Sequence, residues 1–455
     1  MVAMAATASY LQCIGLIFFW SFKPSEPHLS AYLVEVKHFS KHQRDAEIYT
    51  VYSYGSLVVV TLCALVKVYT LRLPNFKGLG NKALILLGAG ARVATRVLLL
   101  YGTTLWQMQL MQVAFSVGLV GEFAFYAYCL KVIPGESQRL TALVQSSYLV
   151  SHTLAGLLGD WLLHHTDLGL VGLLWIAAVS VFLSCPLACS LKEVDKLDRP
   201  AVSPKVLWGI YSSPRYFWLS TLWWVLSYPA YQTIYGYESS LYADRFSDAA
   251  IDHNGSIFAV ALLCGALSSA TLSWHSVERR VRQTPTSVFV LLSCLLSGSM
   301  VAMGWFHSEW NLALSFTVFF ILWSFANALF YGETRRSVDA GLDALHLGEQ
   351  ERKSITASVV STVFMLNSAV GTLVNGIISF VAFNCLDLSV ERVFQAMAIL
   401  QGSLTVLVIG LALGVQRVSS PRSYQEMARV GAVAVPVTAV GFDPQTPPTE
   451  AEQVS

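Results

Sequence analysis

Residues 111–132 read MQVAFSVGLVGEFAFYAYCLKV, an apolar run long enough to cross a lipid bilayer as one helix. It contains a carboxylate, Glu122, far from Lys131 at the end of the run. An ionised carboxylate near the middle of a membrane helix costs about 2.5–3.5 kcal/mol on insertion scales. We therefore expect Glu122 to face a wet cavity, where it marks a substrate or proton pathway, or to pair with a residue of a neighbouring helix.

Composition extends the membrane assignment to the whole chain. Of 455 residues, 55% are hydrophobic and 13% charged, whereas soluble domains have about 25% charged residues. The net charge of +1 gives no basic excess that would favour a nucleic-acid partner. The eight cysteines form no CxxC pair, so we interpret them as small buried hydrophobes. The N-terminus lacks a basic region and a cleavage site, so no cleavable signal peptide is expected.

Further apolar runs of similar length predict an all-α protein with twelve transmembrane helices. The expected spans are residues 8–34, 48–70, 83–105, 108–132, 140–163, 169–191, 216–242, 254–275, 286–307, 310–332, 355–384 and 392–416. They divide the chain into an N-terminal six-helix bundle (1–191), a polar linker (192–215), a C-terminal six-helix bundle (216–416) and a tail (417–455). We expect a short amphipathic surface helix at 203–218 and a disordered tail.

Lysine and arginine residues set the expected orientation, because they are enriched in cytoplasmic loops. Most of them fall in the linker, the tail and the loops on that same side. Both termini and the linker are therefore predicted to be cytoplasmic. Six spans, a cytoplasmic linker and six more spans resemble the plan of a major-facilitator transporter, in which helices 1, 4, 7 and 10 line a central cavity.

Interrupted helices favour such a cavity. Pro24 and Pro27 are predicted to break the first span, and Pro229 and Gly236 the seventh, which is the corresponding helix of the second half. A proline frees backbone carbonyls, and these are tolerated in a membrane only where they are buried or line water. Each break alone is also typical of a kink in a packed bundle, but matched positions favour the cavity.

Several short motifs occur in a fixed order along the chain. They are KPSEP (23–27), YSY (52–54), EFAFYAY (122–128), Gln138-Arg139, TLWW (221–224), Ala230-Tyr231-Gln232, Asn254-Gly255 and Leu366-Asn367-Ser368. As a set, this series resembles the reduced-folate and thiamine carrier family of vertebrates, over spans 1–11 and at low identity. The resemblance implies a vitamin transporter of the plasma membrane, in contact with the lipid bilayer and coupled to a proton or an organic anion.

The resemblance favours the thiamine branch of that family. The folate branch has basic residues for its anionic substrate where this sequence has Glu122, Trp323 and Asn375. The thiamine branch has a glutamate at the position of Glu122 and keeps the one in the SEP motif, here Glu26. One carboxylate would balance the thiazolium charge of thiamine, and aromatic rings would stack on its heterocycles.

The implied substrate-binding residues include several departures from the thiamine branch. Thr50, Phe125 and His152 stand where that branch has aromatic residues, and Gln232 stands where the family has asparagine. A related amine or pyridine-type vitamin therefore remains an alternative to thiamine. The full set of expected contacts is Glu26, Thr50, Glu122, Phe125, Tyr126, His152, Trp224, Tyr231, Gln232, Trp323 and Asn375.

Three further charged residues have two interpretations each. Arg92 and Arg96 share one face of the third span, where they would bind an anion or pair with Glu122 or Asp160. We favour a gating or structural role, because outer helices such as the third rarely line the cavity in this architecture. Glu238 is either a second cavity carboxylate, with Arg245 or Lys23 as its partner in an extracellular gate, or part of a solvated helix end.

The chain has no Gly-rich phosphate loop, HExxH motif or nucleophile elbow. We therefore expect neither an enzyme nor an ATP-driven pump, and no metal or cofactor. The sequence predicts a secondary transporter for thiamine or a related small-molecule organic cation, working by alternating access. The alternatives are a reduced-folate or organic-anion carrier, and a non-transporting receptor that kept the fold.

Overall fold

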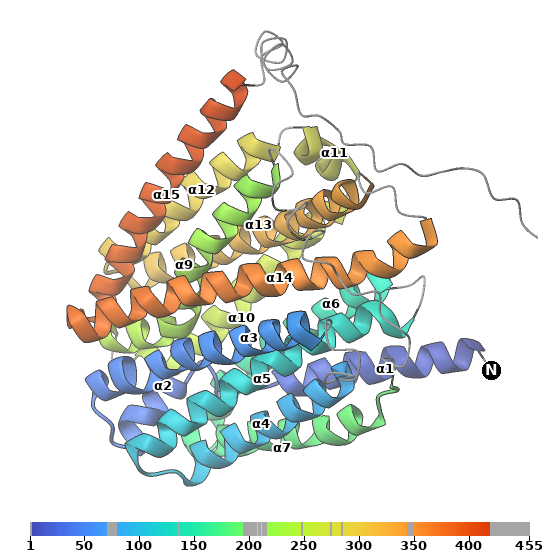
Figure 1. Ribbon diagram of the computed structural model, residues 1–455. Helices are drawn as coiled ribbons and strands as arrows, with labels where there is room; N and C mark the ends of the chain where they lie inside the picture. Colours follow the sequence, from blue (N-terminus) through green and yellow to red (C-terminus); the bar gives the residue numbers. More distant parts are fainter. Residues whose placement is uncertain are drawn as a thin grey trace, which may run out of the picture. The chain divides into compact units, whose positions relative to one another are not determined.

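The computed structural model describes residues 2–70, 80–133, 137–193, 207, 211, 216–246, 249–273, 275–283, 285–343 and 349–418, and all regular structure in these ranges is helical (Figure 1). The expected surface helix at 203–218 and the tail beyond 418 lie outside the described residues, apart from a few positions. The helices are α1 (Val2–Ser21), α2 (Leu29–Ala31), η1 (Tyr32–Val36), η2 (Gln43–Tyr49), α3 (Thr50–Thr70), α4 (Asn81–Tyr101), α5 (Leu105–Val132), α6 (Ser137–His165), α7 (Gly169–Ser190), α9 (Tyr216–Arg245), α10 (Ala249–Ala270), η3 (Thr271–Ser273), α11 (His275–Gln283), α12 (Pro285–Trp305), α13 (Glu309–Asp343), α14 (Glu349–Phe380), η4 (Val381–Cys385) and α15 (Val390–Val418).

Residues up to Gly410 form one compact unit, and Leu411–Val418 are the last turns of α15. Within the described residues, nine stretches are long and apolar enough to cross a membrane. They are Gln43–Cys63, Asn81–Tyr101, Leu105–Tyr126, Gly169–Ser190, His253–Ala270, Ser287–Trp305, Glu309–Phe330, Leu366–Cys385 and Val390–Gly410.

Three of the twelve expected spans are not among these nine. The described apolar part of α1 is shorter, at Thr7–Ser21. α6 and α9 have 29 and 30 residues, which exceeds the length that a span needs, but polar side chains dilute their apolar character. These polar side chains include residues of the candidate site described below.

The expected break in the first span is present, but the one in the seventh is not. α1 ends at Ser21, and residues 22–28 form turns in which the Glu26 amide donates to the Lys23 carbonyl at 3.0 Å. α9 is instead continuous, with Pro229 inside it. Pro229 has no amide hydrogen to donate to the preceding turn, yet the helix continues on both sides of it. The expectation that the two halves have matched breaks is therefore wrong.

Two glycines set the close approach of α4 and α5. A Cβ atom added at Gly88 would lie 2.6 Å from the Cα of Gly121, and one added at Gly121 would lie 2.6 Å from the Cα of Gly88. Small residues let membrane helices pack backbone to backbone. Arg92 and Glu122 follow these glycines by four residues and one residue, so the crossing point brings the two charged side chains together.

We expect Gly121→Ala to lower the stability of the protein by about 1–3 kcal/mol, because the added methyl group overpacks a backbone contact. Gly90→Ala is the matched control. Gly90 lies on the same helix as Gly88 and has nothing within 4 Å of an added Cβ, so its replacement should leave stability unchanged or raise it slightly. Thermal unfolding of both purified variants tests this difference, and equal melting temperatures would contradict it.

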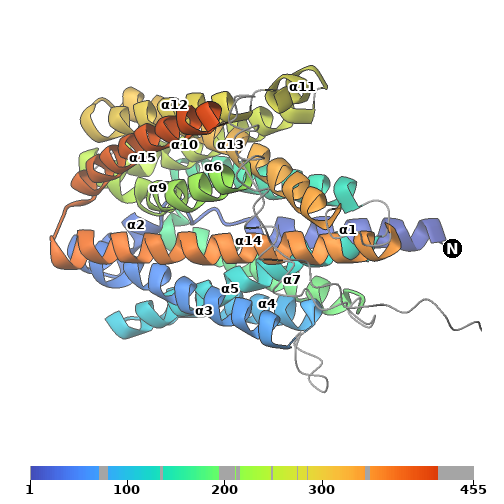
Figure 2. The same ribbon diagram turned by 45° about the horizontal axis from the view of Figure 1, so that its top comes forward.

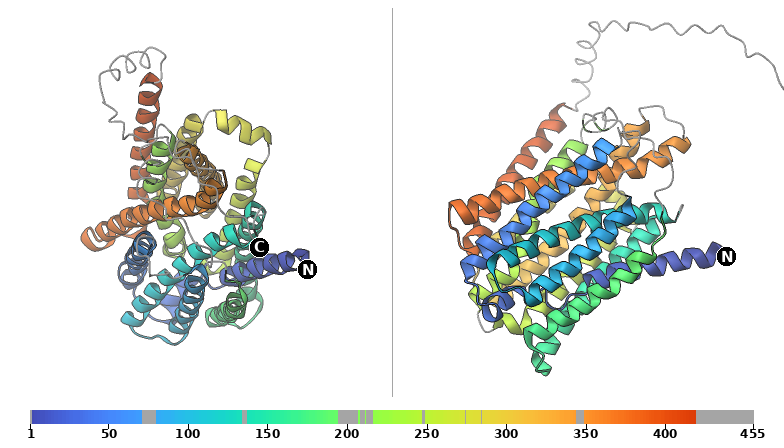
Figure 3. Two further views of the ribbon diagram at one scale, coloured as in Figure 1. Left: turned by 45° about the vertical axis from the view of Figure 1, so that its right-hand side comes forward. Right: turned by 60° about the horizontal axis from the view of Figure 1, so that its bottom comes forward.

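Most of the long helices run roughly alongside one another (Figure 3). The helices before the linker pack together, as do those after it, and the most extensive contacts between the two sets are those of α6 with α10 and of α3 with α14 (Figure 2). In the second contact, the Asn375 amide on α14 donates to the Ser53 hydroxyl on α3 at 3.1 Å. These contacts hold the elements that surround the candidate site.

Candidate functional site

The site is a cavity of about 290 Å³ that is lined by residues from both sets of helices. The lining comes from the break after α1, from η2, and from α3, α4, α5, α6, α9, α10 and α14. Aromatic side chains form much of the wall: Tyr49, Tyr52, Phe115, Phe123, Tyr148, Tyr228, Tyr231, Tyr235, Tyr237 and Phe258. Such a wall suits a flat heterocycle, which stacks on rings, or a cation, which is attracted to their faces.

Glu122 lies in this cavity, where it is paired with an arginine. Arg92 Nη2 donates to Glu122 Oε2 at 2.5 Å, and the Arg92 guanidinium also lies over the Trp20 ring, 4.9 Å from its centroid. The stem of Arg92 fits against Gly118, where an added Cβ would lie 3.0 Å from Arg92 Cγ. The Glu122 carboxylate is therefore already compensated by a positive charge.

Glu26 forms a second ion-paired cluster in the same cavity. Arg96 Nη2 donates to Glu26 Oε2 at 3.0 Å, and Lys23 Nζ lies 3.6 Å from Glu26 Oε1. The helix break puts Lys23 and Glu26 on one turn, while Arg96 reaches them from α4 one helical turn beyond Arg92. Our expectation that α4 stays away from the cavity is not met, because its close contact with α5 brings both arginines inside.

Other predicted contacts also line the cavity: His152, Tyr231, Gln232 and Asn375. Gln232 donates from its amide to the Tyr228 hydroxyl one turn away. Tyr231 stacks on Trp323, with the ring centroids 4.7 Å apart and the planes 8° from parallel. On α9, the residues that face the cavity follow the period of a helix: Tyr228, Tyr231, Gln232, Tyr235 and Ser239.

Five predicted contacts lie outside the cavity lining. Phe125 packs its ring against Trp20 at 5.9 Å, and the Tyr126 hydroxyl donates to Gln145 at 3.0 Å. Thr50 donates to the Ala46 carbonyl within its own helical turn. The fourth and fifth, Trp224 and Trp323, stack on each other at 5.5 Å, and Trp323 supports Tyr231 from behind.

The sequence reasoning also missed several lining residues, although their motifs were noticed. Lys23 lies in the KPSEP motif, and Tyr52 and Ser53 belong to YSY. Phe115 and Leu119 share a helical face with Glu122, since they are seven and three residues before it, and Phe123 beside this face also lines the cavity. Applying the helical period from Glu122 identifies this face.

Glu238 lies in the cavity lining and is only 3% exposed. Neither of its expected partners contacts it. Arg245 donates to the carbonyls of Met303, Gly304 and Phe306 and pairs with Glu391 at 2.9 Å. Lys23 pairs with Glu26, as described above.

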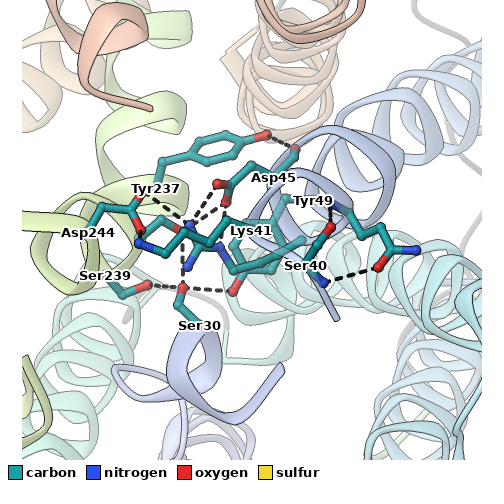
Figure 4. Close-up of polar contacts among 11 residues, drawn as sticks. Ser30, Ser40, Lys41, Asp45, Tyr49, Tyr237, Ser239 and Asp244 are labelled. Atoms are coloured by element: carbon teal, nitrogen blue, oxygen red, sulfur yellow. Dashed lines mark hydrogen bonds and ion pairs between the residues drawn. The ribbon is translucent and has the colours of Figure 1, made fainter. Parts of the chain in front are cut away.

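A polar network, the closure network, joins residues 30–49 to α9 at one end of the cavity (Figure 4). At its centre, Arg44 donates to both carboxylate oxygens of Asp45, at 2.7 and 2.6 Å, and Ser240 donates to Asp45 at 3.1 Å. Lys41 pairs with Asp244 at 2.8 Å. Its other members, Ser30, Tyr49, Tyr237 and Ser239, are linked to it by hydrogen bonds of 2.8–3.4 Å.

A second junction joins α6 and the helix break to α10. Asp160 accepts hydrogen bonds from the Gly255 and Ser256 amides at 3.0 and 2.5 Å, and the Asn254 amide donates to the Pro27 carbonyl at 2.5 Å. Asn254 begins a glycosylation sequon, but it is only 2% exposed. An attached glycan does not fit this arrangement.

A family model described as "Reduced folate carrier" matches residues 6–197. This match covers the N-terminal part of the chain, which resembles the reduced folate carrier family there. Thiamine transporter 1 of Mus musculus is 25% identical over 373 residues, which cover 67% of this chain and 72% of that protein. The reduced folate transporter of Mus musculus is 25% identical over 304 residues, 57% of each chain. The chain is therefore similar to proteins named for two different substrates.

Solved structures show the fold of the chain. A mutant of the nucleoside transporter NupG superposes with a TM-score of 0.60 at 14% identity, covering 88% of this chain and 98% of that one. The human organic anion transporter MFSD10 superposes with a TM-score of 0.55 at 13% identity, covering 90% and 98%. The chain thus has the all-helical fold of these transporters. Its apolar helices, its family match and its relatives are those of a multi-pass membrane transporter and not of an enzyme.

Proposed function

We propose that this protein is a secondary transporter that moves thiamine or a related organic-cation vitamin across the plasma membrane by alternating access. The twelve-helix topology, the two six-helix bundles and the cytoplasmic termini expected from the sequence are part of this proposal. The observation that carries it is one cavity in which Glu26, Glu122 and Glu238 lie among aromatic rings. Carboxylates and ring faces both attract an organic cation.

The dimensions and the polar groups of the cavity support a small substrate. Its volume of about 290 Å³ is at the lower end of ligand pockets, which are about 300–1,000 Å³. Gln232 and Asn375 supply amides that can hydrogen-bond a ring nitrogen or an amino group. A pteroyl-glutamate is larger than thiamine, and its two carboxylates would have to compete with Glu26 and Glu122 for the cations that these glutamates pair with.

The pair of Arg92 and Glu122 changes the role that we assign to Glu122. The sequence suggested that Glu122 balances the charge of the substrate. In the structure, the Glu122 carboxylate is already paired with Arg92, whose Nη2 atom lies 2.5 Å from Glu122 Oε2. We therefore propose that Glu122 neutralises Arg92, so that the cavity does not repel a cation. Glu26 pairs with both Arg96 and Lys23, and its single negative charge offsets one of their two positive charges.

One observation favours a second candidate, an organic-anion carrier. Three cations, Lys23, Arg92 and Arg96, line the cavity, and an anion that displaced a carboxylate from one of them would be bound. Against this, each of the three is already paired with a glutamate. The anion would therefore have to leave a buried glutamate without its partner, which is costly.

Radiolabelled uptake of thiamine, pyridoxine and a reduced folate into cells that express the protein tests the proposal. We expect saturable uptake of micromolar thiamine, and no competition by reduced folate. Saturable uptake of the reduced folate that excess thiamine does not affect would establish the anion carrier instead. Binding of thiamine without flux would indicate a receptor.

A further inference from the structure

Glu238 differs from the other acidic groups at the cavity because it has no partner among the described residues. It is 3% exposed, and within that part of the chain no hydrogen bond or ion pair reaches its carboxylate. The other carboxylates at or beside the cavity are all compensated: Glu26 by Lys23 and Arg96, Glu122 by Arg92, Asp45 by Arg44, and Asp160 by His28 and two backbone amides.

The elements around Glu238 supply no free basic group in the described ranges. α9 packs against α2, η2, α10, α13 and α14. The cavity residues from α10 and α14 are uncharged, Phe258 and Asn375, and Glu309 of α13 accepts from the Tyr242 hydroxyl. At or beside the cavity, the titratable groups from η2, from the break before α2 and from α6 are Arg44, Asp45, Tyr49, Lys23, Glu26, His28, Tyr148, His152 and Asp160.

The basic members of that set are all engaged elsewhere. Lys23, Arg44 and His28 pair with the acidic groups named above, and the His152 ring nitrogen Nδ1 is 2.9 Å from the Tyr148 carbonyl. Glu238 is therefore a buried carboxylate that faces a cavity without a counter-charge. An ionised group of this kind costs several kcal/mol unless it is neutralised by a proton or by a cationic ligand.

Aromatic rings next to Glu238 complete a subsite for such a ligand. Tyr235 lies three residues earlier on α9, and its ring centroid is 5.6 Å from that of Phe258. Tyr231 continues this wall, 5.7 Å from Tyr235. An aromatic cation that stacks on these rings brings its charge close to Glu238. Among the described residues, Glu238 is the one cavity carboxylate without a counter-charge.

We propose that Glu238 binds the positive charge of the transported cation and holds a proton when the cavity is empty. As the cation enters, the O–H bond of the carboxyl group breaks, the proton leaves to water, and the carboxylate balances the charge of the cation. This assignment rests on the proposed function as a cation transporter. It goes beyond that function by naming the residue that exchanges one cation for one proton.

Thiamine binding to the purified protein in weakly buffered solution, with a pH-sensitive dye, tests the exchange. The unmodified protein should release one proton for each thiamine bound. Glu238→Gln, which is neutral and of the same shape, should release none and should bind thiamine about 10- to 150-fold more weakly, as expected for the loss of a close charge pair. Glu35→Gln is the matched control, because Glu35 is exposed, and it should behave as the unmodified protein does.

Glu238→Asp keeps the acid and covers the case in which the glutamine variant fails to fold. It should still release a proton, with weaker binding. Unchanged affinity and proton release in a folded Glu238→Gln protein would overturn the assignment while the proposed function stands. An unmodified protein that binds reduced folate and not thiamine would overturn both.

Discussion

Glu122→Gln is expected to abolish uptake of organic cations while the protein still folds and reaches the membrane. The substitution leaves Arg92, which is 7% exposed, without its counter-charge at the wall of the cavity. Removing one partner of a buried ion pair costs about 3–5 kcal/mol, and the free guanidinium then repels a cationic substrate. We expect the initial rate of thiamine uptake, normalised to surface protein, to fall by about two orders of magnitude or more.

The double variant Arg92→Gln/Glu122→Gln separates the two roles that Glu122 can have. If Glu122 serves to neutralise Arg92, the double variant replaces an ion pair by two neutral amides and should recover much of the uptake. A double variant that reaches the membrane but stays inactive would show that Glu122 itself binds the cation. Normal uptake by the single variant would contradict both roles.

Arg44→Gln is expected to weaken the closure network strongly. Arg44 is 1% exposed and donates twice to Asp45, so its removal leaves a buried carboxylate with only Ser240 as a side-chain donor. The same cost of about 3–5 kcal/mol would shift the equilibrium between closed and open arrangements by about two to three orders of magnitude. The alternating access that we propose requires this network to separate during each cycle, so the variant should favour its open form.

Lys41→Gln is the matched control for Arg44→Gln. Lys41 belongs to the same network, but its side chain is 60% exposed, and exposed ion pairs contribute about 1 kcal/mol or less. Hydrogen–deuterium exchange of residues 29–49, measured by mass spectrometry, should become much faster in Arg44→Gln and change little in Lys41→Gln. Equal exchange in the two variants would contradict a closing role for Arg44.

The sequence predicted the fold class and much of the cavity because both depend on local signals. An apolar run identifies a membrane helix, and a carboxylate inside it must face polar surroundings. Those two rules place Glu122, and the resemblance adds Glu26, Tyr231 and Gln232. The continuous α9 shows a limit of such rules. A proline bends or breaks many helices, but Pro229 lies inside α9 without ending it.

The same signals did not predict which aromatic side chains line the cavity and which pack behind the lining. Phe123 lines the cavity while Phe125, two residues later, packs on Trp20, a difference that the helical period explains. Trp323 lies one layer behind Tyr231, which no sequence pattern specifies. The position of Arg92 depends on the contact between Gly88 and Gly121, a tertiary feature for which isolated glycines are only a weak signal.

The paired charges of the cavity also determine how the membrane voltage acts on the carrier. Moving one elementary charge across 100 mV is worth about 2.3 kcal/mol. Lys23, Arg92, Arg96, Glu26 and Glu122 carry the same total charge in every state of the cavity, and exchange at Glu238 replaces one positive charge by another. The loaded and the empty carrier would then be electrically equivalent. Transport would be electroneutral, driven by the proton gradient and indifferent to the resting potential of the cell.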